Sequence, residues 1–474
     1  MRATCKKHGP PAPRRWCPVL LLTALFLLAP AAFPAPADWI LSARYVITED
    51  SGHRVIENGA VAVTGERIVG VGTKAEIDAR FQARQRLDRP DAILAPGLID
   101  THTHAAMTLF RGIADDLKLQ DWLQKFIFPA EAKNVSADFV RWGTRLGCLE
   151  MLLGGTTTFT DMYYFEDVVA EAAREAGMRG VLGETIIGFP VADAKTPADS
   201  LKFTERYLER FRNDPLITPA VAPHALYTNS DETLKASRAL ANRFHAPLLI
   251  HLAETKKENE DEMAKRHTTA TQTLDRLGVF NGRTVAAHCV WVNDADMAIL
   301  KARNVGVAHC PSSNMMLASG AAPVVKMLAR GIHVGLGPDG PAGSNNDLNM
   351  FEEMDLAAKL QKVTSGDPQA LAAGTVLEMA TIGGARVLGL EKEIGSLEAG
   401  KRADLIMVRL DRPNAVPVYD PVSQMVYSLK AEDVRDVMVD GRAVVRDSKI
   451  LTLDEAAVLE KAREYGVKVR ASLK

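Results

Sequence analysis

Cysteine, aromatic residues and net charge are all scarce in this sequence. Its 474 residues include five cysteines, 6% aromatic residues and a formal net charge of −2. Scattered cysteines without a C-x-x-C pair exclude a disulfide framework and a zinc knuckle. The absence of a basic stripe or a block of like charge makes nucleic acid an unexpected partner. The rest of the composition, 47% hydrophobic and 24% charged, is that of an ordinary globular protein.

The N-terminal apolar run, residues 19–33, is too short to cross a membrane comfortably and contains Pro30. Five basic residues without a single acid precede it, and an A-x-A motif follows it at residues 35–37. This order is typical of a signal peptide. We therefore expect residues 1–37 to be cleaved before Asp38, which predicts an exported protein, periplasmic or secreted, with no stable membrane span. The alternative is an uncleaved anchor or a misassigned start, the latter with a cytoplasmic protein.

Both ends of the remaining chain have the sequence pattern of β-strands. Residues 38–92 contain short alternating strands separated by Gly and Asn, and residues 393–450 are again rich in strands. We expect the two segments to form one small composite β-sandwich, and residues 451–474 to form a C-terminal helix.

The middle of the chain, residues 93–392, alternates short β-like runs with helical patterns. The runs lie at residues 92–100, 156–162, 179–187, 217–223, 247–252, 284–288, 306–309 and 332–337. Eight strands that alternate with helices are the signature of an α/β protein with a (β/α)8 barrel. In such barrels the active site lies at the carboxyl ends of the strands.

Polar residues follow these runs where the rim of the barrel is expected. His102 and His104 end the first run with a spacing of two, so both side chains point to the same side. Later runs end at His224, His251, His288, His309 and Asp339, with Glu254 three residues after His251. Because histidines scattered through a core would not favour strand ends, we interpret this set as one site, with His309 more simply explained as structural.

Four of these residues suffice to hold one divalent metal ion: His102, His104, His251 and Asp339. An open position for water makes such a site catalytic, and Zn²⁺ suits it, although Fe²⁺, Mn²⁺ and Co²⁺ suit the same ligands. Glu254 and His288 are then the candidates for moving protons. The simpler alternatives are core histidines at His251 and His288, a solvated run that includes Glu254, and a turn at Asp339.

Several motifs resemble those of the amidohydrolase superfamily, and the resemblance extends over nearly all of residues 38–450. They are residues 96–104 (PGLIDTHTH), 251–255 (HLAET), 287–289 (AHC), 311–314 (PSSN) and the stretch 395–404. The chain is most similar to the branch that contains 5′-methylthioadenosine/S-adenosylhomocysteine deaminases and triazine or related chlorohydrolases.

The resemblance implies a barrel with a composite β-sandwich and one metal on His102, His104, His251 and Asp339. It also implies that Glu254 shuttles a proton to a ring nitrogen, while Asp339 and His288 handle the attacking water. Binuclear relatives carry a lysine after the fourth strand, where this chain has His224. By the same resemblance His224 contacts a purine, Glu131 contacts ribose hydroxyls and Trp122 lines the pocket.

These features predict hydrolytic deamination of an adenine nucleoside or a related aminated heterocycle, with release of ammonia. Hydrolysis of another amide, an amidine or a halogenated ring is the alternative inside the class. A barrel used only for binding is disfavoured by the intact set of polar residues. The loop at residues 339–346 is one residue longer than the usual form in the family that the chain resembles. The expected partner is a small-molecule substrate, and homo-oligomerisation is left open.

Overall fold

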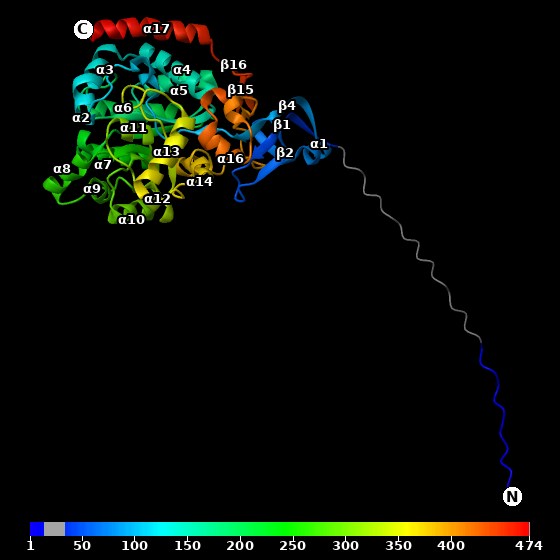
Figure 1. Ribbon diagram of the computed structural model, residues 1–474. Helices are drawn as coiled ribbons and strands as arrows, with labels where there is room; N and C mark the ends of the chain where they lie inside the picture. Colours follow the sequence, from blue (N-terminus) through cyan, green and yellow to red (C-terminus); the bar gives the residue numbers. More distant parts are fainter. Residues whose placement is uncertain (14–33, 474) are drawn as a thin grey trace.

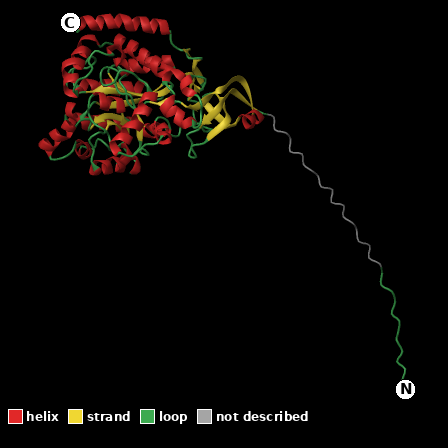
Figure 2. Ribbon diagram, in the orientation of Figure 1, coloured by secondary structure: helices red, strands yellow, loops and turns green. Residues whose placement is uncertain are grey.

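The computed structural model describes residues 1–13 and 34–473 and contains two eight-stranded sheets (Figures 1 and 2). We call them the barrel sheet, ordered β12-β11-β10-β9-β8-β7-β6-β5, and the composite sheet, ordered β16-β15-β14-β13-β4-β1-β2-β3. The apolar run of the predicted signal peptide, residues 19–33, lies outside the described residues. Among the described residues, no helix combines the length and apolar character needed to span a bilayer.

The barrel sheet is parallel throughout, as strands connected by helices require. Its strands are β5 (Leu98–Ile99), β6 (Thr156–Tyr163), β7 (Arg179–Ile186), β8 (Ile217–Pro223), β9 (Leu248–Leu252), β10 (Thr284–His288), β11 (Gly306–His309) and β12 (Val334–Leu336). The ends of the sheet meet where Asp100 pairs with Leu336 and the Thr101 amide donates to the Leu336 carbonyl at 2.8 Å. The predicted (β/α)8 barrel is therefore confirmed.

Helices surround the barrel strands (Figure 2). They are α4 (Ala137–Leu153), α5 (Glu166–Ala176), α6 (Pro197–Arg210), α7 (Asp231–Phe244), α8 (Lys256–Arg266), α9 (Ala270–Arg276), α10 (Asp294–Ala302), α11 (Pro311–Met316), α12 (Val324–Ala329), α13 (Met350–Ser365), α14 (Ala373–Met379) and α15 (Ile382–Leu388). Sequence signals fix their ends: Ser230 caps α7 by accepting from the Thr233 amide, and Gly177 ends α5 in the left-handed conformation.

Short helical segments lie mainly in the connection after β5 and near the C-terminus. They are η1 (Ala105–Phe110), α2 (Leu119–Asp121), η2 (Trp122–Ile127), α3 (Phe128–Asn134), η3 (Leu226–Thr228), η4 (Pro413–Ala415), α16 (Pro421–Ser423), η5 (Gln424–Ser428) and η6 (Ala431–Asp433). The C-terminal helix α17 (Glu455–Ser472) packs against α3, α4 and η1 (Figure 1).

The composite sheet joins strands from both ends of the chain, seen as neighbouring blue and orange ribbons in Figure 1. Its strands are β1 (Ala35–Ile47), β2 (Val55–Thr64), β3 (Arg67–Thr73), β4 (Phe81–Pro96), β13 (Leu405–Arg409), β14 (Val434–Val439), β15 (Arg442–Arg446) and β16 (Lys449–Ile450). A helix that was not predicted, α1 (Lys74–Arg80), interrupts the first group. The capping box formed by Thr73 and Glu76 was its sequence signal.

The apolar run at residues 92–100 was wrongly predicted to be one barrel strand. Its first part ends β4 at Pro96, in the composite sheet, and only β5 belongs to the barrel. The chain crosses between the sheets at Gly97, whose amide donates to the Asp404 carbonyl. A Cβ atom at Gly97 would lie 2.1 Å from the side chain of Thr157, so the close approach of the two sheets requires glycine here.

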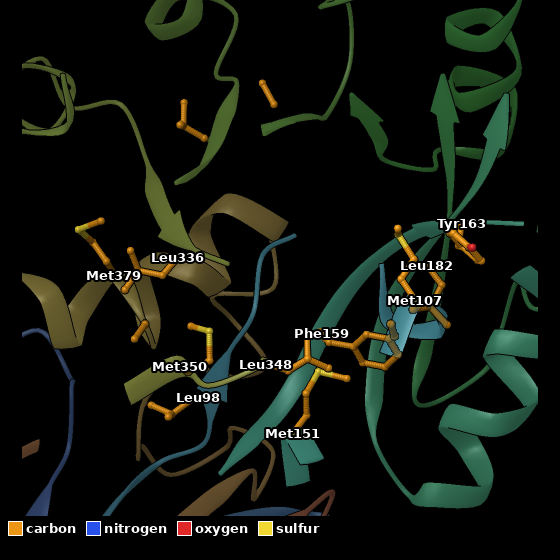
Figure 3. Packing of buried hydrophobic residues seen from close by; sticks show 14 of the residues in the cluster. Leu98, Met107, Met151, Phe159, Tyr163, Leu182, Leu336, Leu348, Met350 and Met379 are labelled. Atoms are coloured by element: carbon orange, nitrogen blue, oxygen red, sulfur yellow. The ribbon is translucent and has the colours of Figure 1, made fainter. Parts of the chain in front are cut away.

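The core lies between the barrel strands and the helices. One large cluster of buried apolar side chains occupies this layer, and Figure 3 shows Phe159 of β6 and Leu336 of β12 with Met151 of α4 and Met350 of α13. Removal of this apolar surface from water is the main stabilising contribution expected for such a layer. The packed helices hold the carboxyl ends of the strands, and therefore the site, in fixed positions.

A buried ion pair ties the barrel to the composite sheet. Arg179, at the start of β7, donates from Nε to Asp404 Oδ2 at 2.8 Å and from Nη2 to Asp404 Oδ1 at 3.2 Å. The same Nη2 lies 3.1 Å from Asp440 Oδ1. Arg179 and Asp404 are 6% and 4% exposed, so neither charge has water as an alternative partner.

We expect Arg179→Met to destabilise the fold by about 3–5 kcal/mol, because it leaves the Asp404 carboxylate buried without its cation. The free energy of unfolding, measured by urea denaturation, checks this. Arg243→Met is the matched control, since Arg243 pairs with Glu205 at the exposed surface and such pairs contribute about 1 kcal/mol or less. Equal losses in the two variants would contradict the role given to the buried pair.

Candidate metal centre and catalytic site

Five of the side chains predicted from the sequence meet at the carboxyl ends of the barrel strands. His102 and His104 follow β5, His251 lies in β9, His288 ends β10 and Asp339 follows β12. The Nε2 atoms of His102 and His104 each lie 3.2 Å from Asp339 Oδ1. One ligand atom from each of His102, His251, His288 and Asp339 lies within 4.8 Å of the others. The convergence expected from strand ends is therefore present.

The backbone holds this arrangement in unusual conformations. Thr103, between the two histidines, pairs with both Asp161 and Asp339, and its hydroxyl donates to the Asp339 carbonyl at 2.9 Å. The Asp339 amide donates to the His102 carbonyl at 3.1 Å. Asp339 and His288 have φ angles of +64° and +72°, a region that residues other than glycine rarely adopt. Such strain persists where the surroundings determine it, and it gathers at functional sites.

Backbone carbonyls select the tautomers of two imidazoles. His104 Nδ1 lies 2.6 Å from the Met162 carbonyl oxygen, and His251 Nδ1 lies 2.8 Å from the His224 carbonyl oxygen. A carbonyl only accepts, so each Nδ1 carries the proton and each Nε2 keeps its lone pair for the centre. His102 Nε2 is also buried and faces Asp339 Oδ1.

This donor set fits one divalent metal ion, and Zn²⁺ suits it best: imidazole nitrogens and a carboxylate oxygen at a buried point are its usual ligands. The four residues whose ligand atoms lie within 4.8 Å of one another include His288, whereas the predicted set of ligands has His104 in its place. His104 nevertheless faces the same oxygen of Asp339, so both rings border the centre. The fourth strand of the barrel, β8, is followed by His224 rather than by a lysine.

The local electrostatics favour neutral rings at His102 and His224, a protonated ring at His104 and an ionised carboxylate at Asp339. Burial lowers the pKa of His102 to about 4 and the pKa of His224 to about 3. Burial opposes charge on Asp339, but hydrogen bonds from His102 and His104 hold the pKa of Asp339 well below its usual range. Burial also opposes charge on His104, yet Asp339 raises the pKa of His104 to about 9. A metal ion needs the same Nε2 lone pair, so its binding releases that proton.

Glu254 is suited to hold a proton beside this centre. It follows β9, is 3% exposed, and its Oε2 lies 3.9 Å from His288 Nε2. Burial and then the charge of Asp339 raise the pKa of Glu254 to about 8. Burial lowers the pKa of His288. At neutral pH the pair therefore combines a protonated carboxyl, which can donate, with a neutral imidazole, which can accept.

A cavity opens onto these groups. Trp122, Glu131 and His224 line it, as the resemblance implied, and all three are held by hydrogen bonds or by packing. Trp122 Nε1 donates to the Ala342 carbonyl at 2.8 Å. Glu131 accepts from the hydroxyl of Tyr163 at 2.8 Å. Tyr163 was not predicted as a site residue, although its place at the carboxyl end of β6 indicated the rim.

His309 differs from the other histidines at strand ends. It is fully buried and is not among the residues that line the cavity. Burial lowers the pKa of His309 to about 3, so its ring is neutral. The structure therefore agrees with the structural role expected for this residue.

Comparisons with known proteins agree with the geometry. Residues 93–444 match the Amidohydrolase family. The chain is 46% identical to 5-methylthioadenosine/S-adenosylhomocysteine deaminase 1 of Syntrophus aciditrophicus, over 92% of this chain and 98% of the relative. It is 48% identical to 5-methylthioadenosine/S-adenosylhomocysteine deaminase of Syntrophobacter fumaroxidans, over 90% and 97% of the two chains.

A solved structure adds to this result. The crystal structure of an adenosine deaminase from Xanthomonas campestris with bound zinc matches with a TM-score of 0.90 and 39% identity, over 92% of this chain and all of that one. The fold, the rim of histidines and aspartate, and the extent of the sequence match together establish that this chain belongs to the amidohydrolase family.

Proposed function

We propose that this protein is a metal-dependent hydrolase that deaminates adenine nucleosides and releases ammonia. One observation carries the proposal: three of the candidate ligands, the proton carrier Glu254 and the acceptor His288 all border the same cavity. The three ligands are His104, His251 and Asp339. The names of the relatives support it, since several are deaminases of 5′-methylthioadenosine and S-adenosylhomocysteine. Family membership makes the chain a hydrolase that acts on carbon–nitrogen bonds.

In this proposal His102, His104, His251 and Asp339 hold the metal. A divalent ion bound there supplies Lewis acidity and lowers the pKa of a water molecule towards neutrality. Asp339 and His288 orient the attacking water and accept its proton as its oxygen bonds to the ring carbon. Glu254 gives its proton to the adjacent ring nitrogen. The former amino group then takes the proton held by Asp339 and His288 and leaves as ammonia when the carbon–nitrogen bond breaks. The new hydroxyl group returns a proton to Glu254.

Other residues that line the cavity suit the purine and the ribose of a nucleoside. We assign His224 to the purine, Glu131 to the ribose hydroxyls and Trp122 to the lining. Burial raises the pKa of Glu131 to about 7, and the hydroxyl of Tyr163 holds one of its oxygens. In this assignment the Glu131 carboxyl accepts from a sugar hydroxyl. Hydrolysis of another amide, an amidine or a halogenated ring would use the same centre, so a substrate panel should include these classes.

The lining of the cavity favours substrates with neutral tails. Among the described residues that line the cavity are the carboxyl groups of Glu131, Glu254 and Asp339, and no arginine or lysine. Lys195 and Lys202, the nearest candidates along the chain after β7, are not part of the lining. An anionic tail would therefore lose water without gaining a cation.

His102→Ala should remove metal and activity together, because His104 alone cannot replace the two ligands that follow β5. Metal content by plasma emission and ammonia release from a panel of nucleosides, measured on one sample, check this. His53→Ala is the control, since His53 lies exposed on the loop between β1 and β2. A His102→Ala variant with stoichiometric metal and normal turnover would overturn the assignment of the centre.

Glu254→Gln is nearly isosteric and should keep the metal while slowing turnover by about 10²-fold or more, the scale of acid–base catalysis. The measurement is kcat with metal content on the same preparation. Glu260→Gln, an exposed change on the neighbouring helix α8, should leave both unchanged. Loss of metal from Glu254→Gln would instead place Glu254 among the ligands.

Substrates with a neutral tail, such as 5′-methylthioadenosine, should be preferred over S-adenosylhomocysteine. A carboxylate without a charged hydrogen-bond partner forfeits about 1.5–3 kcal/mol, or about 10- to 100-fold in affinity. The ratio of kcat/KM for the two thioether nucleosides decides the point. Equal values, or a preference for the amino-acid tail, would refute the charge argument.

We further propose that residues 1–37 direct export and are removed before Asp38. A variant that starts at Asp38 should be folded and active, because β1 keeps its pairing with β4 from Trp39 onwards. Mass analysis of the N-terminus in the native cell tests processing. Unprocessed protein in the cytoplasm would contradict the proposed export but not the proposed deamination.

A further inference from the structure

Residues 311–314 (PSSN) have no part in the mechanism above, yet they place two buried polar side chains behind the centre. Ser313 and Asn314 lie in α11, directly after β11, and both are fully buried. Each contacts a different side chain of the site. Ser313 Oγ donates to Asp339 Oδ2 at 2.6 Å, and Asn314 Oδ1 lies 3.1 Å from His288 Nδ1.

The hydrogen bond from Ser313 divides the roles of the two Asp339 oxygens. Oδ1 faces the imidazoles of His102 and His104 at 3.2 Å, whereas Oδ2 is held by the serine. The Asp339 backbone is already fixed by Thr103 and by the His102 carbonyl. The last torsion of an aspartate is broad, so without the serine the carboxylate could still rotate. Ser313 removes that remaining freedom.

Asn314 acts on the other side of the centre. When His288 donates its Nδ1 proton to Asn314 Oδ1, the ring leaves Nε2 unprotonated and directed towards Glu254, 3.9 Å away. The hydrogen bond at one ring nitrogen selects the state of the other. Asn314 Nδ2 is buried without a hydrogen-bond partner among the described residues. Such a group is costly to bury, so an amide at this position calls for a specific role.

We propose that Ser313 and Asn314 are positioning residues: Ser313 presents one oxygen of Asp339 to the metal, and Asn314 holds the tautomer of His288 that accepts the proton of the attacking water. The part that concerns turnover rests on the proposed function. The parts that concern metal affinity and tautomer do not, and they can be tested without a substrate.

Ser313→Ala should weaken metal binding by about 10- to 100-fold, the scale for losing a partner that orients a ligand. Titration of the metal-stripped protein with Zn²⁺ against a competing chelator, and the visible spectrum of the Co²⁺ form, measure this. Ser312→Ala is the matched control, because the Ser312 hydroxyl is buried but has no hydrogen-bond partner among the described residues, and only its amide contacts Glu353. Wild-type affinity in Ser313→Ala, or an equal loss in Ser312→Ala, would overturn the role of Ser313.

Asn314→Leu should lower kcat by about 10- to 100-fold with KM and metal content unchanged, since it removes only the partner of His288. Asn314→Asp restores an acceptor for the Nδ1 proton and should recover most of the rate. Ring nitrogen shifts in histidine-labelled protein report the tautomer directly and should show mixed states only in the leucine variant. Thermal melts establish that each variant is folded.

An unchanged tautomer in Asn314→Leu, or an aspartate variant as slow as the leucine variant, would overturn the role of Asn314. If the wild type binds metal but deaminates no substrate in the panel, the proposed function fails. The metal titration of Ser313→Ala and the tautomer of Asn314→Leu still decide the positioning roles in that case.

Discussion

Several imidazole nitrogens can direct their lone pairs at one buried metal site only if the other nitrogen of each ring already has a hydrogen-bond partner. In this protein His104 and His251 meet that demand by donating from Nδ1 to backbone carbonyls of Met162 and His224. Both carbonyls belong to the rim of the same barrel, so the fold itself selects the tautomers. The ionised carboxylate of Asp339 then gives the centre its negative charge. Metal binding, proton transfer and the choice of substrate all depend on this arrangement.

Much of the site could be predicted from the sequence because its residues follow one geometric rule. His102, His251 and Asp339 each come directly at the end of an apolar run, and the carboxyl ends of barrel strands share a rim. The eight runs expected for the barrel agree with the observed strands within a few residues, apart from the first. Burial on both faces makes such strands nearly continuous apolar segments, which is why they stand out.

The features that could not be predicted depend on contacts between distant segments. The division of residues 92–100 between two sheets follows from the approach of Gly97 to Thr157, which no local pattern announces. The PSSN motif was visible, but the contacts of Ser313 and Asn314 with Asp339 and His288 required the structure.

The stretch at residues 395–404 has a structural role and takes no part in the proposed chemistry. Asp404 binds Arg179 and accepts from the Asp440 amide at 2.7 Å, and its carbonyl accepts from Gly97. These bonds hold the composite sheet against the start of β7 and the crossing that leads to the first histidines.

The most direct test is hydrolysis of 5′-methylthioadenosine in water enriched in ¹⁸O, by one preparation assayed before and after removal of its metal. We predict one ammonia released for each ¹⁸O atom found in the purine product, with activity lost on chelation and restored by one equivalent of Zn²⁺. Equal turnover by the metal-free protein, or a zinc-loaded enzyme that yields no ammonia, would contradict it.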